Sequence, residues 1–361
     1  MLSGYYGYDN AGDEAVLSAI LSHLSAQQPG VEFVVTSGAP AQTEAMHAAA
    51  NNLSVSGASE YSLRAVARDN FKNIWQEIKS CDAFISGGGS LLQDVTSLRN
   101  IVYYIGLIRL AQFARKPVMI YAQGIGPLQK PISQKLTRAA LNHRKTIITV
   151  RDPESKALLQ KIGVRQNIEI TADPVWALEP KGQKSKSKNQ SPIWCISLRT
   201  WLHKSTPDAE KRLLDTIRAA AKTQNATLKF LAMQPERDRA LMESLGVENT
   251  EILATENLHP REIMALAGEC DLMIAMRLHA LIFAAAQGVP CVAVSYDPKV
   301  ASLAKLLGAP VISDASESEL AKLHASNSIA APSTPFVAEM QSKARRNAEL
   351  AAQILSVSPF S

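Results

Sequence analysis

Hydrophobic positions along the chain fall into short β-branched runs separated by longer segments of helical periodicity. Alternation of this kind is typical of parallel βα units, so the pattern predicts an α/β protein. The expected helices are Ala11–Gln27, Leu63–Lys79, Leu91–Phe113, Pro207–Thr223 and Pro260–Ala267. The expected strands are Glu32–Thr36, Cys81–Ser86, Val118–Ala122, Thr146–Val150, Ile168–Thr171, Ile193–Leu198, Thr227–Met233, Glu251–Leu253, Asp271–Ala275, Cys291–Ser295 and Pro310–Ile312.

The two halves of the chain repeat one arrangement. A strand at Cys81–Ser86 leads into three glycines, and a similar strand at Cys270–Ala275 leads into Met276–His279. In each half a helix and a second apolar strand follow. This repeat predicts two Rossmann-like, doubly wound domains that face a central cleft. Ligands of such sheets bind at the carboxyl ends of the strands, so the residues just after each strand are the candidates for a site.

A polar, lysine-rich segment at residues 179–192 separates the halves. It is bounded by prolines and contains no apolar anchor, which is typical of a solvated linker. An interpretation as a nucleic-acid patch is less favoured. The linker divides an N-terminal domain over residues 1–178 from a C-terminal domain that begins at residue 193.

Composition indicates an ordinary globular protein. Of the 361 residues, 46% are hydrophobic and 20% charged, which excludes a disordered chain, a collagen-like repeat and a membrane-embedded bundle. The net charge is +5, and only 6% of residues are aromatic, so nucleic acid is not an expected partner. A mild positive excess fits an anionic small substrate and contact with an anionic membrane surface equally well.

The location predicted from the sequence is cytoplasmic. The longest apolar stretch, Ile101–Ala114, is interrupted by Arg109 and Gln112 and is too short to span a bilayer, and no secretory signal is visible. A place at the inner face of the membrane remains open if a partner holds the protein there. The four cysteines are spread singly in apolar runs, so we expect buried thiols rather than a metal site or disulfides.

A glycine-rich segment, Gly4–Glu14, opens the chain and runs into a helix. Glycines allow close backbone approach to a ligand, and a helix N-terminus offers N–H groups to an anion. Asp13 is a candidate for binding hydroxyls or accepting a proton, whereas Glu14 is expected only to complement the helix dipole. Because only Met1–Ser3 precede this segment, we expect either that the first strand is very short or that the natural start lies upstream.

Further glycine-rich turns follow the next strands of the N-terminal half. They are Ser86–Asp94, with three consecutive glycines, and Gln123–Pro127. A nicotinamide site is disfavoured because no G-x-G-x-x-G follows a strand with an acid at the expected place. Arg151 also ends a strand and is a candidate anion ligand, while Asp152 is expected to cap the next helix.

In the C-terminal half, Arg277 and His279 lie two residues apart at a strand-to-helix turn. Arginine grips a carboxylate or phosphate bidentately, and histidine transfers a proton near neutral pH. Lys299 and Arg199 follow neighbouring strands and are further anion ligands, whereas residues 236–238 are expected to be helix-start charges. No metal-binding motif is present in the sequence, so no metal site is predicted.

These motifs together resemble those of polysaccharide pyruvyl transferases. The resemblance spans nearly the whole chain, from Gly4 to Lys299, and its nearest branch comprises bacterial cell-surface anchoring enzymes. It rests on G-Y-Y-G-Y-D-N-A-G-D-E-A from residue 4, S-G-G-G-S-L-L-Q-D from residue 86, Q-G-I-G-P from residue 123, R-D-P-E-S from residue 151 and M-R-L-H-A-L-I-F-A-A-A-Q-G-V-P from residue 276.

The resemblance implies a fold similar to that of GT-B glycosyltransferases. Two Rossmann-like domains would then be followed by a last helix that packs back on the first domain. The amphipathic tail Phe336–Leu355 suits that helix. We therefore expect the C-terminal domain to cover residues 193–335 and the returning helix to lie within residues 336–361.

The same resemblance implies transfer of pyruvate from phosphoenolpyruvate onto two hydroxyls of a sugar, with no further cofactor. His279 would be the general acid, and Asp13 or Asp94 the base. The donor would be bound by Arg151, Arg277, Lys299 and Arg199. The acceptor, lipid-linked or free and with β-N-acetylmannosamine as the expected sugar, would be bound by Tyr8, Asn10, Gly88, Gly89 and Gln123.

Two other functions remain open from the sequence. A GT-B glycosyltransferase with a nucleotide-sugar donor would share the fold and use the same loops for a pyrophosphate. A non-enzymatic binding protein is less favoured, because several glycine-rich motifs stand at the ends of strands. The oligomeric state is also open.

Overall fold

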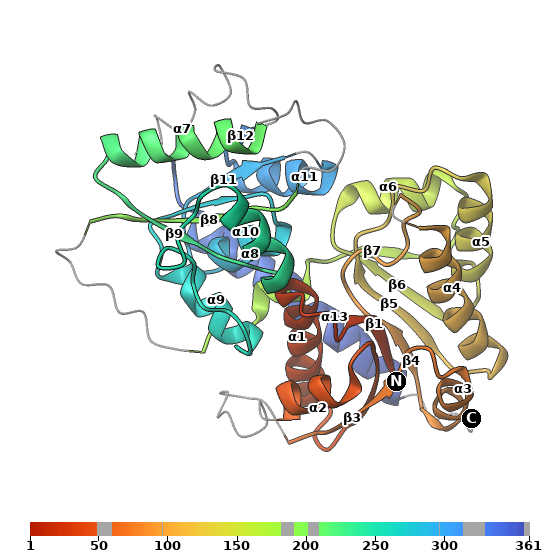
Figure 1. Cartoon of the computed structure of the whole chain (residues 1–361). Coiled ribbons are helices and arrows are strands. Elements are labelled where there is room, and N and C mark those ends of the chain that lie inside the picture. Colours follow the sequence, from red (N-terminus) through yellow and green to blue (C-terminus); the bar gives the residue numbers. More distant parts are fainter. Residues whose placement is uncertain are drawn as a thin grey trace. The chain divides into compact units, whose positions relative to one another are not determined.

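The chain forms two compact units (Figure 1). Unit 1 contains Met1–Tyr8, Asp13–Leu178 and the residues from Met340 onward, and unit 2 contains Asp9–Gly12 and Glu179–Glu339. The computed structural model describes residues 1–48, 60–95, 97–181, 191–200, 209–295, 297–312 and 329–356. Most of the predicted linker, residues 182–190, thus lies outside the described residues.

Unit 1 is built on a seven-stranded sheet in which every strand pairing is parallel. Its order, β3-β2-β1-β4-β5-β6-β7, is the Rossmann order with one added strand, and it reverses between β1 and β4. The strands are β1 (Leu2–Tyr6), β2 (Glu32–Ser37), β3 (Ser62–Ala67), β4 (Phe84–Ser86), β5 (Val118–Gln123), β6 (Thr146–Val150) and β7 (Ile168–Ile170). The helices are α2 (Pro40–Ala48), α3 (Phe71–Ser80), α4 (Leu98–Phe113), α5 (Pro131–Leu141), α6 (Pro153–Lys161) and the 3-10 helix η2 (Pro174–Ala177), together with most of α1 (Ala11–Gln27) and of α13 (Thr334–Ser356), whose first residues belong to unit 2.

Unit 2 has a five-stranded sheet, again with parallel pairing throughout. Its order, β12-β11-β10-β8-β9, reverses between β8 and β10, which is the second common doubly wound arrangement. The strands are β8 (Ile193–Ser197), β9 (Thr227–Phe230), β10 (Leu272–Ala275), β11 (Cys291–Val294) and β12 (Val311–Ile312). The helices are α7 (Ala209–Thr223), α8 (Pro235–Ser244), α9 (Pro260–Gly268), α10 (Leu278–Ala285) and α11 (Pro298–Leu307).

The predicted fold class, an α/β protein with two doubly wound parallel sheets, is confirmed. Many elements were also located correctly, since α1 has the expected bounds and most expected strands are present. Two expectations near strands were wrong in detail. β1 has five residues, because Gly4–Tyr6 continue the strand, and the expected strand Glu251–Leu253 forms only an isolated bridge from Ile252 to Phe230.

The single helix expected over Leu63–Lys79 is wrong, because the first part of this segment is β3 and the second is α3. β3 lies at the edge of the sheet, where one neighbour covers it, and its residues are exposed or half-buried. An edge strand therefore carries few strongly apolar residues, and here their spacing resembles that of a helix.

The helix expected over Leu91–Phe113 starts later, at Leu98. Ser97 is its N-cap, since the serine side chain accepts a hydrogen bond from the Arg99 amide at 3.1 Å. Leu91 and Leu92 are buried in the preceding turn, so their apolar character reflects core packing rather than helical periodicity.

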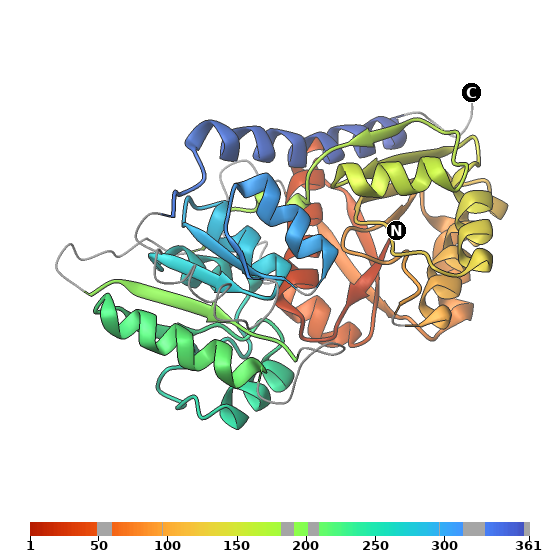
Figure 2. The same ribbon diagram turned by 90° about the horizontal axis from the view of Figure 1, so that it is seen from above.

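The C-terminal helix α13, blue in Figure 2, packs against β7 and the residues that follow it. The Thr171 hydroxyl donates to the Asn347 side chain at 2.8 Å, and the Asn347 amide donates to the Ala172 carbonyl at 3.2 Å. The Arg346 guanidinium forms an ion pair with Glu169 at 3.0 Å. These contacts attach residues from the end of the chain to unit 1. In the described part of the chain, no helix is long and apolar enough to cross a membrane.

A buried histidine ties α1 to η2. The His23 Nε2–H donates to the Ala177 carbonyl oxygen at 3.0 Å. Burial lowers the pKa of His23 from 6.5 to about 4; the hydrogen bond to Ala177 opposes this shift, and the nearby Arg345 adds to it. The imidazole is therefore neutral in the folded protein at neutral pH.

We expect the protein to lose stability as the pH falls from about 6.5 towards 4. The unfolded chain protonates His23 near pH 6.5 and the folded chain only near pH 4, so protons favour the unfolded state across this window. The full effect corresponds to about 3 kcal/mol. Urea unfolding of wild type and His23→Gln at several pH values measures it; the amide keeps a donor but does not titrate. Equal pH dependence in the two proteins would contradict the assignment.

Candidate active site

The carboxyl edge of the unit 1 sheet collects the residues singled out in the N-terminal half. The loops that follow parallel strands all lie at one edge of the sheet. The strand order reverses between β1 and β4, and this reversal is the switch point at which ligands of such sheets bind. The loop after β1 leads to Asp13, and the turn after β4 contains Gly88 and Gly89. A Cβ atom at Gly89 would lie 3.2 Å from the Asp13 Oδ1. The structure therefore brings Asp13 and the glycine triplet together at this switch point.

The three glycines of that turn are required by packing. A Cβ at Gly87 would lie 2.2 Å from the Tyr6 hydroxyl, and one at Gly88 would lie 2.8 Å from a Val16 methyl. Gly89 has a φ of 82°, a left-handed conformation that favours glycine. The space beside the Cα of Gly88 is thus occupied by α1, whereas the Cα of Gly89 adjoins the Asp13 carboxylate. The predicted roles of Gly88 and Gly89 in acceptor binding stay predictions.

Glu14 has a larger role than the expected dipole complement. It is buried; one of its carboxylate oxygens accepts a hydrogen bond from the Gly7 amide at 2.7 Å, and the other is 3.0 Å from the His47 Nε2. His47 is in turn 3.2 Å from the Ser18 hydroxyl. This buried network fixes the bend after β1.

A bulge at the end of β5 orients Gln123. Ala122 has a φ of 47°, and the pairing with β6 shifts register between Ile120 and Gln123. The Gln123 Nε2 donates to the Ser86 hydroxyl at 2.7 Å and to the Gly87 carbonyl at 2.9 Å. The amide thus clamps the turn after β4, and its Oε1 is buried without a hydrogen-bond partner in the described residues. Its predicted contact with the acceptor stays a prediction.

Arg151 reaches the same edge from the end of β6, and its side chain is only 7% exposed. The guanidinium is paired with buried Asp173 at 2.9 Å and donates to the Ser90 hydroxyl at 3.2 Å. Gly124 makes room for it, since a Cβ there would lie 2.7 Å from Nη2. Asp152 caps α6 as expected, accepting from the Ser155 amide at 2.7 Å. The charge of Arg151 is therefore partly compensated within unit 1.

Asp94, one of two predicted bases, is engaged by the backbone. Its carboxylate oxygens accept hydrogen bonds from the Gln129 and Lys130 amides at 2.8 and 2.7 Å. Burial by itself raises the pKa of Asp94, but these hydrogen bonds outweigh burial and lower it. A carboxylate stabilised in this way is a weak base, so the geometry favours Asp13 over Asp94.

The carboxyl edge of unit 2 gathers the cations predicted in the C-terminal half. Arg199 follows β8, Arg277 and His279 follow β10, and Lys299 stands just after the end of β11. These are three adjacent strands, and the sheet reverses between β8 and β10. The sequence-predicted cations thus flank the switch point of this sheet. Tyr296, which lies between β11 and Lys299, is outside the described residues.

Arg277 is fixed by Asp238 on α8. Its guanidinium donates to one carboxylate oxygen, and the other accepts from the Met233 and Gln234 amides at 3.1 and 2.9 Å. The Asp238 side chain is only 2% exposed, so it is an anchor and not the simple helix-start charge that was expected. The Arg277 Nε is buried without a hydrogen-bond partner among the described residues, which leaves it a donor for a ligand.

His279 stands in the first turn of α10, two residues after Arg277. Gly12, which belongs to unit 2 by its contacts, makes room for the ring: a Cβ there would lie 2.2 Å from the His279 Nδ1. Asn10 caps the segment, its side-chain oxygen accepting from the Gly12 amide at 3.1 Å. Asn10 therefore has a structural role, and its predicted acceptor contact stays a prediction.

Tyr8 belongs to an aromatic cluster around an arginine that the sequence analysis missed. Tyr8 stacks on Tyr5 with ring centroids 4.3 Å apart, and its hydroxyl accepts from Arg68 at 3.2 Å. Arg68 directly follows β3, the strand that was predicted as helix. A strand assignment would have placed Arg68 at a strand end and made it a candidate.

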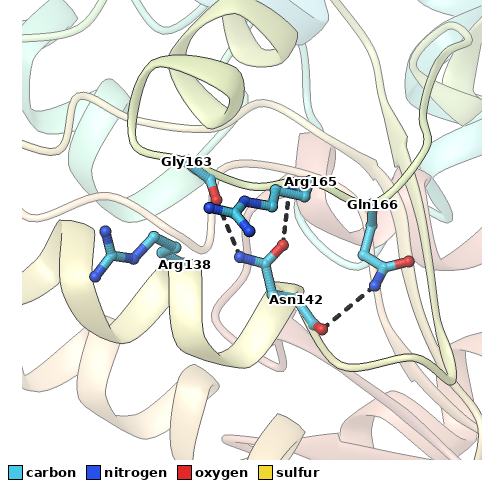
Figure 3. A pocket seen from close by; sticks show the side chains of 5 residues that line it. All are labelled: Arg138, Asn142, Gly163, Arg165 and Gln166. Atoms are coloured by element: carbon cyan, nitrogen blue, oxygen red, sulfur yellow. Dashed lines mark hydrogen bonds between the residues drawn. The ribbon is translucent and has the colours of Figure 1, made fainter.

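A surface cavity of about 430 Å³ lies at the opposite, amino edge of the unit 1 sheet (Figure 3). Arg138, Asn142, Gly163, Arg165 and Gln166 line it. The Asn142 side chain is occupied there, since it donates to the Gly163 carbonyl and accepts from the Arg165 amide. None of the predicted site residues lies in this cavity.

Solved structures of low sequence identity share the fold. A UDP-GlcNAc 2-epimerase from Methanocaldococcus jannaschii matches with a TM-score of 0.65 and 12% identity over 98% of both chains. A putative UDP-N-acetylglucosamine 2-epimerase from Listeria monocytogenes has a TM-score of 0.61 and 11% identity over 98% of this chain and 95% of its own. The protein Alr3699/HepE from Anabaena, in complex with UDP and glucose, has a TM-score of 0.56 and 14% identity over 99% of both chains. The protein therefore has a GT-B-like fold.

The model of the polysaccharide pyruvyl transferase family matches residues 10–298. The chain belongs to this family of transferases, as its motifs predicted. The matched region includes the loop after β1 and ends just before Lys299. No curated protein sequence matches the chain.

We expect Gly124→Ala to disturb the ion pair between Arg151 and Asp173. The new methyl group would clash with the buried Arg151 guanidinium. To remove the clash, the guanidinium would have to move and lose its contact with Asp173. Overpacking of this kind costs about 1–3 kcal/mol. Gly106→Ala on α4 is the control: a Cβ there meets nothing within 4 Å, and alanine stabilises a helix by about 1 kcal/mol. If the denaturant midpoints of Gly124→Ala and Gly106→Ala moved in the same direction, the proposed packing of Gly124 against Arg151 would be refuted.

Proposed function

We propose that the protein transfers pyruvate from phosphoenolpyruvate onto two hydroxyls of a cell-envelope sugar, forming a cyclic ketal and releasing phosphate. The observation that carries the proposal is the Arg277 side chain at the switch point of unit 2. Asp238 holds one end of the guanidinium, and the buried Nε has no protein partner among the described residues. Membership of a pyruvyl transferase family supports the same reaction.

Phosphoenolpyruvate suits the cations at this edge. The molecule carries a carboxylate and a phosphate, so its binding needs several cations held in fixed positions. In the proposal Arg277, Lys299 and Arg199 bind these groups. Arg151 adds N–H donors rather than net charge, because Asp173 compensates it. In the proposal these side chains alone bind the donor, with no metal and no further cofactor.

The proposed chemistry begins with proton transfer from His279 to the methylene carbon of phosphoenolpyruvate. Protonation turns that carbon into a methyl group and makes the neighbouring carbon electrophilic. The first sugar hydroxyl adds to this carbon, and the bond to the phosphate oxygen breaks. The second hydroxyl then closes the ring. Of the two hydroxyl protons, one replaces the proton given by His279 and the other leaves with phosphate.

Asp13 is the proposed base that takes up a hydroxyl proton. It lies beside Gly89 at the switch point of unit 1, where Tyr8 and the glycine-rich turns would hold the sugar. We propose β-N-acetylmannosamine of a surface-anchoring polysaccharide as the acceptor sugar, on the resemblance of the motifs to that branch. Some structural neighbours are described as UDP-sugar complexes, which keeps a nucleotide-sugar glycosyltransferase as the alternative.

The deciding experiment incubates the protein with phosphoenolpyruvate and aryl-linked β-N-acetylmannosamine. We expect a product heavier by one pyruvate ketal, with one phosphate released per product, measured by mass spectrometry and a phosphate assay. A parallel reaction with UDP-GlcNAc should give no glycosylated product. Transfer only with the nucleotide-sugar would reject the proposal and favour a glycosyltransferase.

Variants then test the roles within the reaction. His279→Ala should lower kcat by roughly 10²–10⁴-fold, the usual contribution of a general acid. Asp13→Asn should lower kcat more than it raises the KM for phosphoenolpyruvate. Asp94→Asn should chiefly lower the denaturant midpoint, because the amide cannot accept two backbone hydrogen bonds in the same way. A larger rate loss for Asp94→Asn than for Asp13→Asn would exchange the two roles.

We also propose that unit 1 touches an anionic membrane surface through α3 and α4. Phe71, Val102 and Phe113 are 57%, 49% and 79% exposed on these helices, and Phe113 packs against Trp75. The two helices also carry four exposed cations, Lys72, Lys79, Arg99 and Arg109. Glu77 is the one acidic residue on the two helices, and it is paired with Arg64. Exposed apolar side chains and cations on the same helices fit an anionic lipid surface.

Co-sedimentation with phosphatidylglycerol vesicles measures this contact. We expect Phe71→Ser with Phe113→Ser to reduce the bound fraction severalfold, because both aromatic side chains would insert among the lipids. Ile132→Ser is the matched control, since Ile132 is similarly exposed but stands on α5 rather than on α3 or α4. An equal loss in the control, or no binding by the wild type, would reject the contact.

A further inference from the structure

Arg68 occupies a fixed position at the carboxyl edge of unit 1. It follows β3 directly, and its backbone amide donates to the Ser37 carbonyl at 3.0 Å. The Tyr103 hydroxyl donates to the Arg68 carbonyl, also at 3.0 Å. The backbone of Arg68 is thus held on both sides, at the edge where the loops after β1 and β2 also emerge.

Three tyrosine rings surround the Arg68 guanidinium. Its central carbon lies 4.5 Å from the ring centroid of Tyr103, 5.6 Å from that of Tyr8 and 5.7 Å from that of Tyr104. Nη1 also donates to the Tyr8 hydroxyl at 3.2 Å. Arginine stacked on aromatic faces keeps its planar fork in one orientation. These contacts therefore hold the guanidinium in one conformation before any ligand binds.

No carboxylate is paired with Arg68 in the described residues. Three other arginines, by contrast, are each paired with a carboxylate, in the pairs Arg64–Glu77, Arg151–Asp173 and Arg277–Asp238. Burial alone lowers the pKa of Arg68, but Tyr104 and Tyr8 raise it overall, so the group stays charged. A half-buried, oriented cation without an acidic partner is equipped to bind an anion.

The residues around Arg68 indicate what kind of molecule would carry the bound anionic group. The stacked Tyr5–Tyr8 pair forms an aromatic surface beside the guanidinium, and Gly38 gives Tyr8 its space, since a Cβ there would lie 2.6 Å from the ring. Tyr104 belongs to the same cluster, and its hydroxyl donates to the carbonyl of Gly4 on β1 at 3.3 Å. The cluster therefore adjoins the strand whose following loop leads to Asp13.

We propose that Arg68 and its tyrosines bind a phosphate carried by the glycan acceptor, the group that would join the sugar to its carrier. The fork of the guanidinium donates to two phosphate oxygens, and the tyrosine rings cover the adjoining part of the acceptor. The assignment of this phosphate to the glycan acceptor rests on the proposed function. The proposal that Arg68 binds an anion does not depend on that function.

A titration without turnover tests the anion site itself. Inorganic pyrophosphate is added in the presence of saturating phosphoenolpyruvate, and binding is followed by ³¹P NMR. We expect Arg68→Gln to bind at least tenfold more weakly than wild type. Arg64→Gln is the matched control, because Arg64 stands on β3, four residues before Arg68, is exposed and is paired with Glu77. Equal affinities for Arg68→Gln and Arg64→Gln would overturn the proposal.

A second arm assigns the phosphate to the acceptor. The ratio of kcat/KM is measured for an alkyl-diphosphate-linked sugar and for the aryl glycoside of the same sugar. Wild type should favour the diphosphate acceptor about tenfold, Arg68→Gln should lose this preference, and Arg68→Lys should keep part of it. A preference that persists in Arg68→Gln would overturn the acceptor assignment. Absence of transfer from phosphoenolpyruvate would reject the proposed function, while the pyrophosphate titration would still decide on Arg68.

Discussion

In both sheets every described strand pairs in parallel, so each strand ends at the same edge as its neighbours. The loops that follow are forced together there, and the reversal of strand order leaves space between two of them. In unit 1 this space lies between the loops after β1 and β4, and in unit 2 between those after β8 and β10. Residues far apart in sequence, such as Asp13 and Gly89, become neighbours through this constraint alone.

Buried aspartates fix two arginines that stand at these carboxyl edges. Asp173 pairs with Arg151 and also caps η2, while Asp238 pairs with Arg277 and binds two backbone amides. Each aspartate is thus anchored before it orients its arginine. Loss of one partner of a buried pair costs about 3–5 kcal/mol, because the other charge stays unpaired. The arginines are therefore fixed in advance, and ligand binding does not have to order them.

Prediction from sequence succeeded where the signal is local. α1 has its predicted bounds because a run of apolar and small residues without proline, and without glycine after Gly12, is favourable to a helix, and Arg277 was found because it stands at the end of a clearly apolar strand. Its partner was not foreseen. Asp238 lies in the first turn of α8, where an acid already has a local explanation, and only the tertiary fold brings it to Arg277. A long-range ion pair leaves no pattern in one sequence.

The failure at β3 shows how one wrong element conceals a site. A helix over Leu63–Lys79 would place Arg68 on a helical surface, where a lone cation needs no explanation. Tyr104 is buried in α4, and Tyr103 packs half-buried against the same core, so core packing already explains both rings without a ligand.

The two carboxyl edges also differ in chemical character. Unit 1 presents a carboxylate, glycine-rich turns and tyrosine rings, which suit hydroxyls and the faces of a sugar. Unit 2 presents arginine, lysine and histidine, which suit a small anion. Arg68 is the exception in unit 1, because its charge lies among aromatic rings instead of opposite an acid. A sugar alone gives no reason for a cation there, whereas a sugar that carries a phosphate does.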